Sequence, residues 1–202
     1  MIDTVIFDIG KVLIEWDWKQ YLDQFDYSKE KKERLAKAMF LNPVWEETDR
    51  GVWSDEEILN AFAKEAPEYR EEITLLWNNM QKCVWRKPYT DQWIADLKKD
   101  GKKVYYLSNY GRTLREKTKE ALAFTENCDG GIFSYEVNLI KPDLAIYKAL
   151  LEKYNLDTSR CVFIDDLEKN IQGAKSCGMD GIWFIDYPQA RRLLEEKLKG
   201  DN

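Results

Sequence analysis

Carboxylates that end apolar runs are the residues of this sequence best placed to do chemistry. Asp8 ends the run TVIFD, and the adjacent pair Asp165 and Asp166 ends the run CVFIDD. Adjacent carboxylates after a buried strand repel each other unless a cation or hydrogen-bond donors offset their charge. Three carboxylates can hold Mg²⁺, a hard ion that prefers oxygen ligands and is typically shared with a substrate phosphate. The pattern therefore indicates a metal-assisted site for phosphoryl transfer.

Other polar residues can complete such a site. Ser108 and Asn109 end the run KVYYLSN, and Lys141 opens the segment KPD. Lys141 supplies a positive charge, while Ser108 and the backbone N–H groups of Ile9 and Gly10 can bind phosphate oxygens. Each residue alone is common in turns and helix caps, so the prediction depends on their combination.

Composition narrows the possible chemistry. The chain has no histidine, which removes Ser-His and Cys-His dyads and histidine metal ligands. A carboxylate nucleophile is already ionised at neutral pH and needs no activating base. Phosphoryl transfer to an aspartate is therefore possible without histidine.

The charge and the apolar runs bear on partners and location. A net charge of −6 over 202 residues argues against a nucleic-acid partner, which requires clustered Lys and Arg. No apolar run approaches the roughly twenty residues that cross a bilayer, and the first residues lack a secretory pattern. We therefore expect a cytoplasmic protein with no membrane or nucleic-acid partner.

The elements that must position these residues alternate along the chain. Continuous apolar character, rather than alternation, predicts a Rossmann-like open parallel sheet of about five strands with helices on both faces, an α/β fold. The expected strands are 4–8, 103–109, 130–134, 161–166 and 181–186, and the expected helices between and after them are 90–100, 112–124, 143–155, 168–177 and 188–199.

One interval breaks this alternation. About eighty residues after the first strand contain helical patterns and no convincing strand, where a simple crossover needs far fewer. We predict a small all-helical cap subdomain at 15–85, inserted into a core domain formed by 1–14 and 86–202. Its helices are expected at 28–40, beginning at Ser28, at 54–66, beginning with a capping box from Ser54 to Glu57, and after Pro67 through about Lys82.

With these elements in place, the chain resembles the haloacid dehalogenase-like (HAD) hydrolase superfamily over essentially its whole length. The matching motifs, in order, are VIFDIGKV with Asp8, YYLSNYG with Ser108 and Asn109, LIKPDLAIY with Lys141, and VFIDDLEKNIQGA with Asp165, Asp166 and Asn170. The sequence looks most like a helical-cap branch with the pattern FDxGxV, which includes sugar-phosphate phosphatases such as glucose-1-phosphatase.

The resemblance implies roles for the nucleophile and the metal ligands. Asp8 would form an aspartyl-phosphate and contact Mg²⁺ through its other oxygen, and the backbone carbonyl of Gly10 would be a further ligand. Asp166 matches the direct metal ligand. Asp165 would be a ligand or its neighbour in the second layer, and Asn170 would position a metal-bound water.

The resemblance also implies roles around the phosphate. Ser108 would bind the phosphoryl group, Asn109 would help to orient it, and Lys141 would link the charges of nucleophile and phosphate. The expected partner is a small phosphorylated metabolite, with a sugar phosphate favoured.

Gly10 departs from most phosphatases of this superfamily. They carry an Asp there that protonates the leaving oxygen and then activates water, a role worth about two to four orders of magnitude in rate. Asp17, in the segment EWDW, is the acidic residue to test first as a substitute. Metal-bound water or the substrate itself are the other options.

Two alternatives to a Mg²⁺-dependent phosphatase stay open. A 2-haloacid dehalogenase uses the same Asp nucleophile without metal, although the pair Asp165 and Asp166 would then oppose an anionic substrate. The other alternative is a metabolite-binding or interaction protein on the same scaffold, in which Gly10 marks the loss of catalysis.

Overall fold

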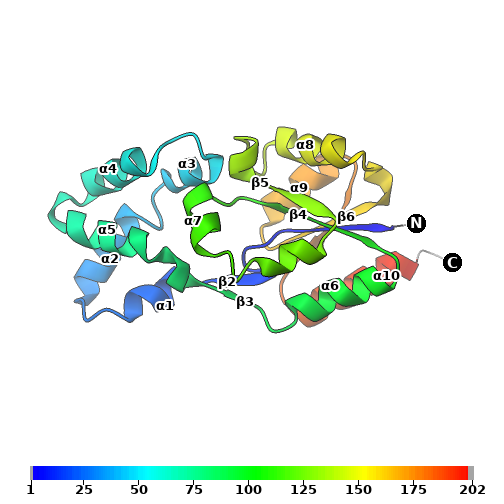
Figure 1. The fold of residues 1–202 in the computed structure, drawn as a ribbon, viewed down its shortest axis with the longest axis horizontal. Helices are drawn as coiled ribbons and strands as arrows, with labels where there is room; N and C mark the ends of the chain where they lie inside the picture. The colour runs from blue at the N-terminus through cyan, green and yellow to red at the C-terminus, as the bar shows by residue number, and fades with distance from the viewer. Residues whose placement is uncertain (1, 200–202) are drawn as a thin grey trace.

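A five-stranded parallel sheet forms the centre of the molecule in the computed structural model, which describes residues 2–199. The strand order is β5-β4-β1-β6-β7, so the first strand lies in the middle (Figure 1). The strands are β1 (Thr4–Phe7), β4 (Lys103–Ser108), β5 (Gly130–Phe133), β6 (Cys161–Asp165) and β7 (Asp180–Trp183). The α/β fold and the five parallel strands predicted from the sequence are confirmed.

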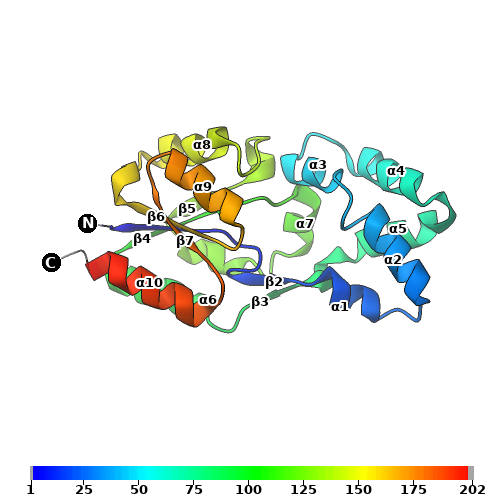
Figure 2. The same cartoon turned by 180° about the vertical axis from the view of Figure 1, so that it is seen from behind.

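Helices cover both faces of this sheet. One face carries α6 (Thr90–Lys99) and α10 (Tyr187–Lys199), and the other carries α8 (Leu144–Tyr154) and α9 (Glu168–Ser176), as Figures 1 and 2 show from opposite sides.

Successive residues of β1 face opposite sides of the sheet. Val5 and Phe7 belong to one buried apolar cluster, and Ile6 belongs to the other. Phe7 packs against Trp93 of α6, with ring centroids 4.7 Å apart. A strand buried on both faces is continuously apolar, which is why the sequence pattern identified it.

The helix expected at 112–124 is shorter than predicted. It ends as α7 (Arg112–Lys117), and the chain continues through turns into η3 (Ala123–Asn127). The Thr118 hydroxyl donates to the carbonyl of Leu114 at 2.7 Å and lies 2.8 Å from the Tyr110 hydroxyl. Hydroxyl side chains that bond the backbone locally compete with helix propagation, which is consistent with this early end.

Between β1 and α6 the chain is mostly helical. The helical elements are α1 (Trp18–Asp23), α2 (Lys29–Ala38), α3 (Trp45–Arg50), α4 (Asp55–Glu65), η1 (Pro67–Tyr69), α5 (Arg70–Asn78) and η2 (Met80–Cys83). The expected cap at Ser28 and the capping box of Ser54 and Glu57 are both present. The sequence prediction missed α1 and α3, because six residues are too few to show a helical period.

The segment entering these helices pairs with the segment leaving them. β2 (Ile14–Trp16) and β3 (Val84–Arg86) form a two-stranded antiparallel sheet. Glu15 in β2 forms ion pairs with both Lys11 and Lys87. This pair lies at the borders predicted for the cap subdomain, although the division into core and cap stays a prediction.

Aromatic side chains form the interior of the helical layer. Trp45 lies 6.0 Å from Phe62, with their rings stacked, and Trp18 stacks on Phe40 at 5.2 Å. Among residues 2–199, no helix combines the length and the apolar character that a bilayer crossing requires.

The remaining short elements are η4 (Ser134–Glu136), which follows β5, and η5 (Thr158–Arg160), which precedes β6. η4 contacts α3, and α7 contacts η2, so both η4 and α7 join the core to the helical layer.

Candidate active site

Three adjacent strands bring the predicted residues to one edge of the sheet. Asp8 directly follows β1, Ser108 ends β4 and Asp165 ends β6. Since β4, β1 and β6 are neighbours and parallel, their carboxyl ends meet, which is where open α/β sheets bind ligands. A cavity of about 290 Å³ opens at this edge. Its lining includes Asp8, Gly10, Ser108, Asn109, Lys141, Asp166 and Asn170.

Lys141 joins two carboxylates beneath this cavity. Its Nζ lies 2.8 Å from Asp8 Oδ1 and 2.7 Å from Asp165 Oδ2, and its side chain is 1% exposed. Burial opposes the charge of Lys141, but Asp165 and Asp8 outweigh that effect and raise its pKa. Lys141 is therefore a fixed cation beside the proposed nucleophile.

Asp8 is held in place by hydrogen bonds, and the pKa of its carboxyl is raised. Its Oδ1 accepts the Ile9 N–H at 2.7 Å as well as the Lys141 ammonium. Burial raises the pKa of Asp8 to about 7, with Lys141 opposing the rise and Asp165 and Asp166 adding to it. The Ile9 N–H, expected at the phosphate, is thus donated to the carboxylate itself.

Asp165 and Asp166 are adjacent but occupy different surroundings. Asp165 is fully buried, and its oxygens accept from Lys141, from the Leu167 N–H at 2.8 Å and from Asn170 Nδ2 at 3.0 Å. Asp166 instead lines the cavity, and burial together with Asp165 raises its pKa to about 6. Asp165 is therefore the more extensively hydrogen-bonded of the two carboxylates, and Asp166 is the one that lines the cavity.

Asn109 bonds to the backbone of Lys141. Its Oδ1 accepts the Lys141 N–H at 2.8 Å, and its Nδ2 donates to the Lys141 carbonyl at 3.1 Å. Both ends of this amide are used on the backbone of Lys141. The side chain therefore fixes the lysine segment to the end of β4, and a contact of its second Nδ2 hydrogen with a phosphoryl group stays a prediction.

The residues at this edge fit a divalent cation. One carboxylate oxygen each from Asp8, Asp165 and Asp166 lie within 4.8 Å of one another. Lys141 is the buried cation among them, so negative charge remains in excess. Asn170 Oδ1 is buried without a hydrogen-bond partner among residues 2–199, so it is available to a metal-bound water. Hard oxygen donors of this kind suit Mg²⁺.

The structure does not bring Asp17 to the cavity. Its side chain caps α1 by accepting the Gln20 N–H at 2.9 Å, and it is not among the residues that line the cavity. At Gly10, a Cβ would meet no atom of the described residues within 4 Å, so there is open space for a side chain at this position. Other groups of the lining, metal-bound water and the substrate itself stay open as the substitute acid.

Sequence reasoning missed Asp49, which lines the same cavity from α3. Asp49 is half-buried, and burial raises the pKa of its carboxyl to about 7, with Lys141 opposing the rise and Asp8 and Glu46 adding to it. The segment WEETDRG offers no sequence signal beyond the glycine that ends α3, because the function of Asp49 depends on which part of the core α3 contacts.

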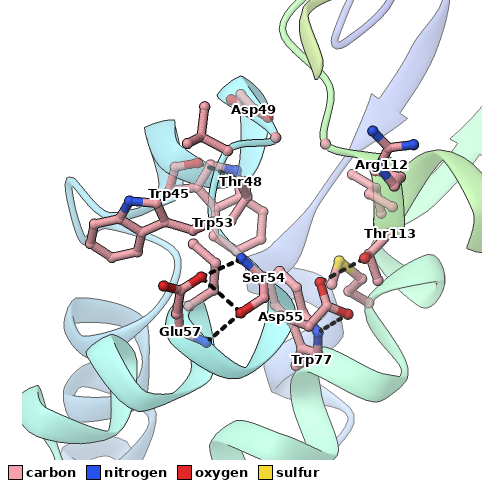
Figure 3. A pocket seen from close by; sticks show the side chains of 16 residues that line it. Trp45, Thr48, Asp49, Trp53, Ser54, Asp55, Glu57, Trp77, Arg112 and Thr113 are labelled. Carbon is pink, nitrogen blue, oxygen red and sulfur yellow. Dashed lines mark hydrogen bonds between the residues drawn. The ribbon is translucent and has the colours of Figure 1, made fainter. Parts of the chain in front are cut away.

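A second cavity of about 390 Å³ lies between the helical layer and α7 (Figure 3). Trp45, Asp49 and Leu114 line both cavities, so the two adjoin. Asp55 accepts from Thr113 at 2.7 Å and from Trp77 Nε1 at 3.3 Å. The second cavity thus provides room beside the nucleophile, with indole rings, hydroxyls and the Arg112 guanidinium in its lining.

The haloacid dehalogenase-like hydrolase family matches residues 2–178. Among curated proteins, the chain is 25% identical over 202 residues to a drimenol cyclase of Aspergillus calidoustus, with 96% of this chain covered. The chain spans only 36% of the length of that relative. It is also 24% identical over 196 residues to a phosphatase of Mycobacterium tuberculosis, covering 88% of this chain and 85% of that one.

Solved structures share the fold. A HAD family enzyme of Bacteroides thetaiotaomicron, determined with magnesium and inorganic phosphate, superimposes with a TM-score of 0.71 at 20% identity, covering 90% of this chain and 93% of that chain. An L-2-haloacid dehalogenase of Xanthobacter autotrophicus, carrying covalently bound chloropropionic acid, gives 0.64 at 17% identity, with 99% and 84% covered. At these identities the likeness shows the fold alone.

Proposed function

We propose that this chain, which belongs to the haloacid dehalogenase-like hydrolase family, is a Mg²⁺-dependent phosphatase of a small phosphorylated metabolite. The observation that carries the proposal is the row of charges Asp8, Lys141 and Asp165, with Asp166 facing the same cavity. It supports a nucleophilic carboxylate on Asp8, held beside a fixed cation and a group that can bind a metal.

The cation would be held by Asp8, Asp166 and the backbone carbonyl of Gly10. When bound, Mg²⁺ supplies positive charge that offsets the repulsion between the anionic nucleophile and an anionic phosphate. The relative from Bacteroides thetaiotaomicron that was determined with magnesium and inorganic phosphate supports this choice of ion and substrate class.

The protein residues then carry the reaction. Lys141 orients Asp8 and adds positive charge close to the phosphoryl group, and Asn109 keeps the lysine segment in register. Ser108 lines the cavity and can donate to a phosphoryl oxygen. Asp8 attacks phosphorus, the bond to the leaving oxygen breaks, and water later hydrolyses the aspartyl-phosphate.

Cavity size and charge support a small anionic substrate. The cavity at Asp8 and its neighbour hold about 290 and 390 Å³, which suits a metabolite rather than a folded protein. Lys169 lines the first cavity at an exposed position and adds positive charge. Indole rings and hydrogen-bonding groups in the second cavity are suited to a sugar, so a sugar phosphate is our preferred class.

The test is release of inorganic phosphate from a panel of sugar phosphates and other phosphomonoesters, with Mg²⁺ and with EDTA. We expect release that requires Mg²⁺ and that Asp8→Asn abolishes. Halide release from 2-haloacids without metal would favour the dehalogenase alternative, for which Asp8 is equally needed. Tight binding of a phosphorylated metabolite without turnover would favour a binding protein and overturn the enzyme proposal.

A further inference from the structure

The proposed phosphatase reaction leaves one task unassigned. The leaving oxygen needs a proton when its bond to phosphorus breaks, and the water that attacks the aspartyl-phosphate must lose one. Gly10 has no side chain for this task, and the chain has no histidine. Asp17 caps α1 and does not line the cavity.

Few titratable groups in the cavity lining are free for proton transfer. Asp8 and Asp166 are already assigned to the nucleophile and the metal. The Tyr110 hydroxyl is 2.8 Å from the Thr118 hydroxyl, and burial raises its pKa far above neutrality. Glu46 is exposed. Among the described residues Asp49 remains, and its carboxylate makes no hydrogen bond or ion pair with any of them.

We infer that Asp49 is the general acid and base of the reaction, supplied by α3 from the helical layer in place of the acid missing at Gly10. This inference rests on the proposed phosphatase function. Its basis is position: Asp49 lines both the cavity that contains Asp8 and the adjoining cavity. A substrate with its phosphate at Asp8 and its leaving group in the second cavity has its leaving oxygen between the two.

Contacts with the core fix the end of α3 that carries Asp49. The Asp49 carbonyl accepts the Ser134 hydroxyl at 2.5 Å, and the next carbonyl, of Arg50, accepts Asn138 Nδ2 at 2.8 Å. A Cβ at Gly111 would lie 2.7 Å from the Thr48 carbonyl, so α3 touches the loop after β4 directly. Figure 3 shows Asp49 apart from the two hydrogen-bonded groups in this cavity, Ser54 with Glu57 and Asp55 with Thr113 and Trp77.

The charge state of Asp49 suits both halves of the task. Burial raises its pKa to about 7, with Lys141 opposing the rise and Asp8 and Glu46 adding to it. At neutral pH the protonated and ionised forms are therefore both populated, which is the condition for an efficient acid that later serves as a base. Asp49 lies in the last turn of α3, at the negative end of the helix dipole, which also raises the pKa of its carboxyl.

The two steps balance as follows. In the first, an Asp8 oxygen bonds to phosphorus, the bond from phosphorus to the leaving oxygen breaks, and the Asp49 carboxyl gives its proton to that oxygen. The products are an alcohol, an aspartyl-phosphate and an Asp49 carboxylate. In the second, this carboxylate takes a proton from water while the water oxygen bonds to phosphorus. The bond from phosphorus to Asp8 breaks, inorganic phosphate leaves, and both aspartates return to their starting states.

The experiment compares two substrates of similar size whose leaving groups differ in their need for a proton. 4-Nitrophenyl phosphate releases a stabilised phenolate, whereas benzyl phosphate releases an alkoxide that must be protonated. In Asp49→Asn we expect kcat/KM for benzyl phosphate to fall by about 10²- to 10⁴-fold, and kcat/KM for 4-nitrophenyl phosphate to fall by less than about tenfold. The mutant should also release a burst of nitrophenol, because hydrolysis of the aspartyl-phosphate has lost its base.

Two further variants keep this test specific. Asp17→Asn retains a good helix cap and should leave both substrates unaffected. Gly10→Asp in the Asp49→Asn background should restore benzyl phosphate turnover, because the new side chain has room beside Asp8.

Equal losses for both substrates in Asp49→Asn, or no loss for either, would overturn the inference while leaving the phosphatase proposal intact. A wild-type protein that hydrolyses neither substrate with Mg²⁺, together with silence across the phosphomonoester panel, would instead remove the proposed function itself.

Discussion

The carboxyl edge of the sheet and the face where α3 meets the core differ in how their residues are positioned. At the sheet edge, Asp8, Lys141 and Asp165 are locked by two short ion pairs within buried surroundings. At the α3 face, Asp49 is held through its backbone, by Ser134, and its carboxylate makes no ion pair with residues 2–199. The sheet edge holds its charged groups in ion pairs, whereas α3 places at the cavity a carboxylate that has no ion pair among residues 2–199.

This difference separates two parts of catalysis. Groups that stabilise charge must be preorganised, which burial and ion pairing achieve at the sheet edge. A group that exchanges a proton must reach the substrate and change its charge, so it cannot be tied into an ion pair. The comparison predicts that variants at the sheet edge change both stability and activity, whereas variants at the α3 face change mainly activity.

The largest expected effect is at Lys141. Lys141→Met leaves Asp8 and Asp165 buried without their cation, which should lower the free energy of unfolding by about 3–5 kcal/mol at pH 7.5. Phosphatase activity should fall by at least roughly 10³-fold, since a fixed charge beside the phosphoryl group is lost. Chemical denaturation and phosphate release measure the two effects. Lys148→Met, at an exposed position of α8, is the control and should change neither. Unchanged stability in Lys141→Met would contradict the ion-pair account of this edge.

A smaller and more selective effect is expected at Gly111. In Gly111→Ala the new methyl group would approach the Thr48 carbonyl to 2.7 Å and displace α3. We expect kcat/KM to fall by about 10- to 100-fold, because a displacement of roughly 1 Å can cost that much. The loss of unfolding free energy should be only about 1–3 kcal/mol.

The control for Gly111 is Gly101→Ala. Gly101 has a φ of 71° and no atom near its Cβ position, so the substitution strains the backbone far from α3. It should lower the melting temperature without changing kcat/KM. If Gly111→Ala also leaves kcat/KM unchanged, contact with α3 is not needed for activity.

The smallest effect concerns pH and metal. Folding raises the pKa of Asp8 and Asp49 to about 7 and of Asp166 to about 6, from an ordinary value of 3.8. Between pH 3.8 and about pH 7 the folded protein therefore binds more protons than the unfolded chain. The free energy of unfolding falls as pH rises through this interval. Without metal, the melting temperature should be higher at pH 5.5 than at pH 7.5.

Mg²⁺ should reverse this trend, because it binds the ionised carboxylates. At pH 7.5, near one hundred times its dissociation constant, it should raise the melting temperature by about 5 °C, and by less at pH 5.5. Differential scanning calorimetry with Mg²⁺ and with EDTA measures both effects, and Asp166→Asn should lose the response to Mg²⁺. A response that is equal at the two pH values would contradict carboxylate ligation.

The sequence was sufficient to predict the sheet and which residues meet at its carboxyl edge. Asp8, Ser108 and Asp165 each end a continuously apolar strand, so local pattern and parallel topology together bring them to one edge. The helices with full capping signals, such as α4 at Ser54, were also predictable.

What the sequence did not reveal depends on contacts between distant segments. β2 and β3 are three residues each, and α3 is six, so none shows a measurable period. Asn109 and Asp49 are positioned by bonds to Lys141 and Ser134, which lie 32 and 85 positions away. Asp17 was a reasonable choice by position in the sequence, but its side chain serves as a local helix cap.

The most direct measurement is detection of the covalent intermediate. Wild type, Asp8→Asn and Asp49→Asn are mixed with 4-nitrophenyl phosphate and Mg²⁺, quenched in acid within milliseconds to seconds, and examined by intact-protein and peptide mass spectrometry. We predict a transient phosphoryl adduct on Asp8 in the wild type, an accumulating adduct on Asp8 in Asp49→Asn, and none in Asp8→Asn. Turnover with no adduct on Asp8 in any variant, or an adduct that persists in Asp8→Asn, would contradict the division of labour between the sheet edge and α3.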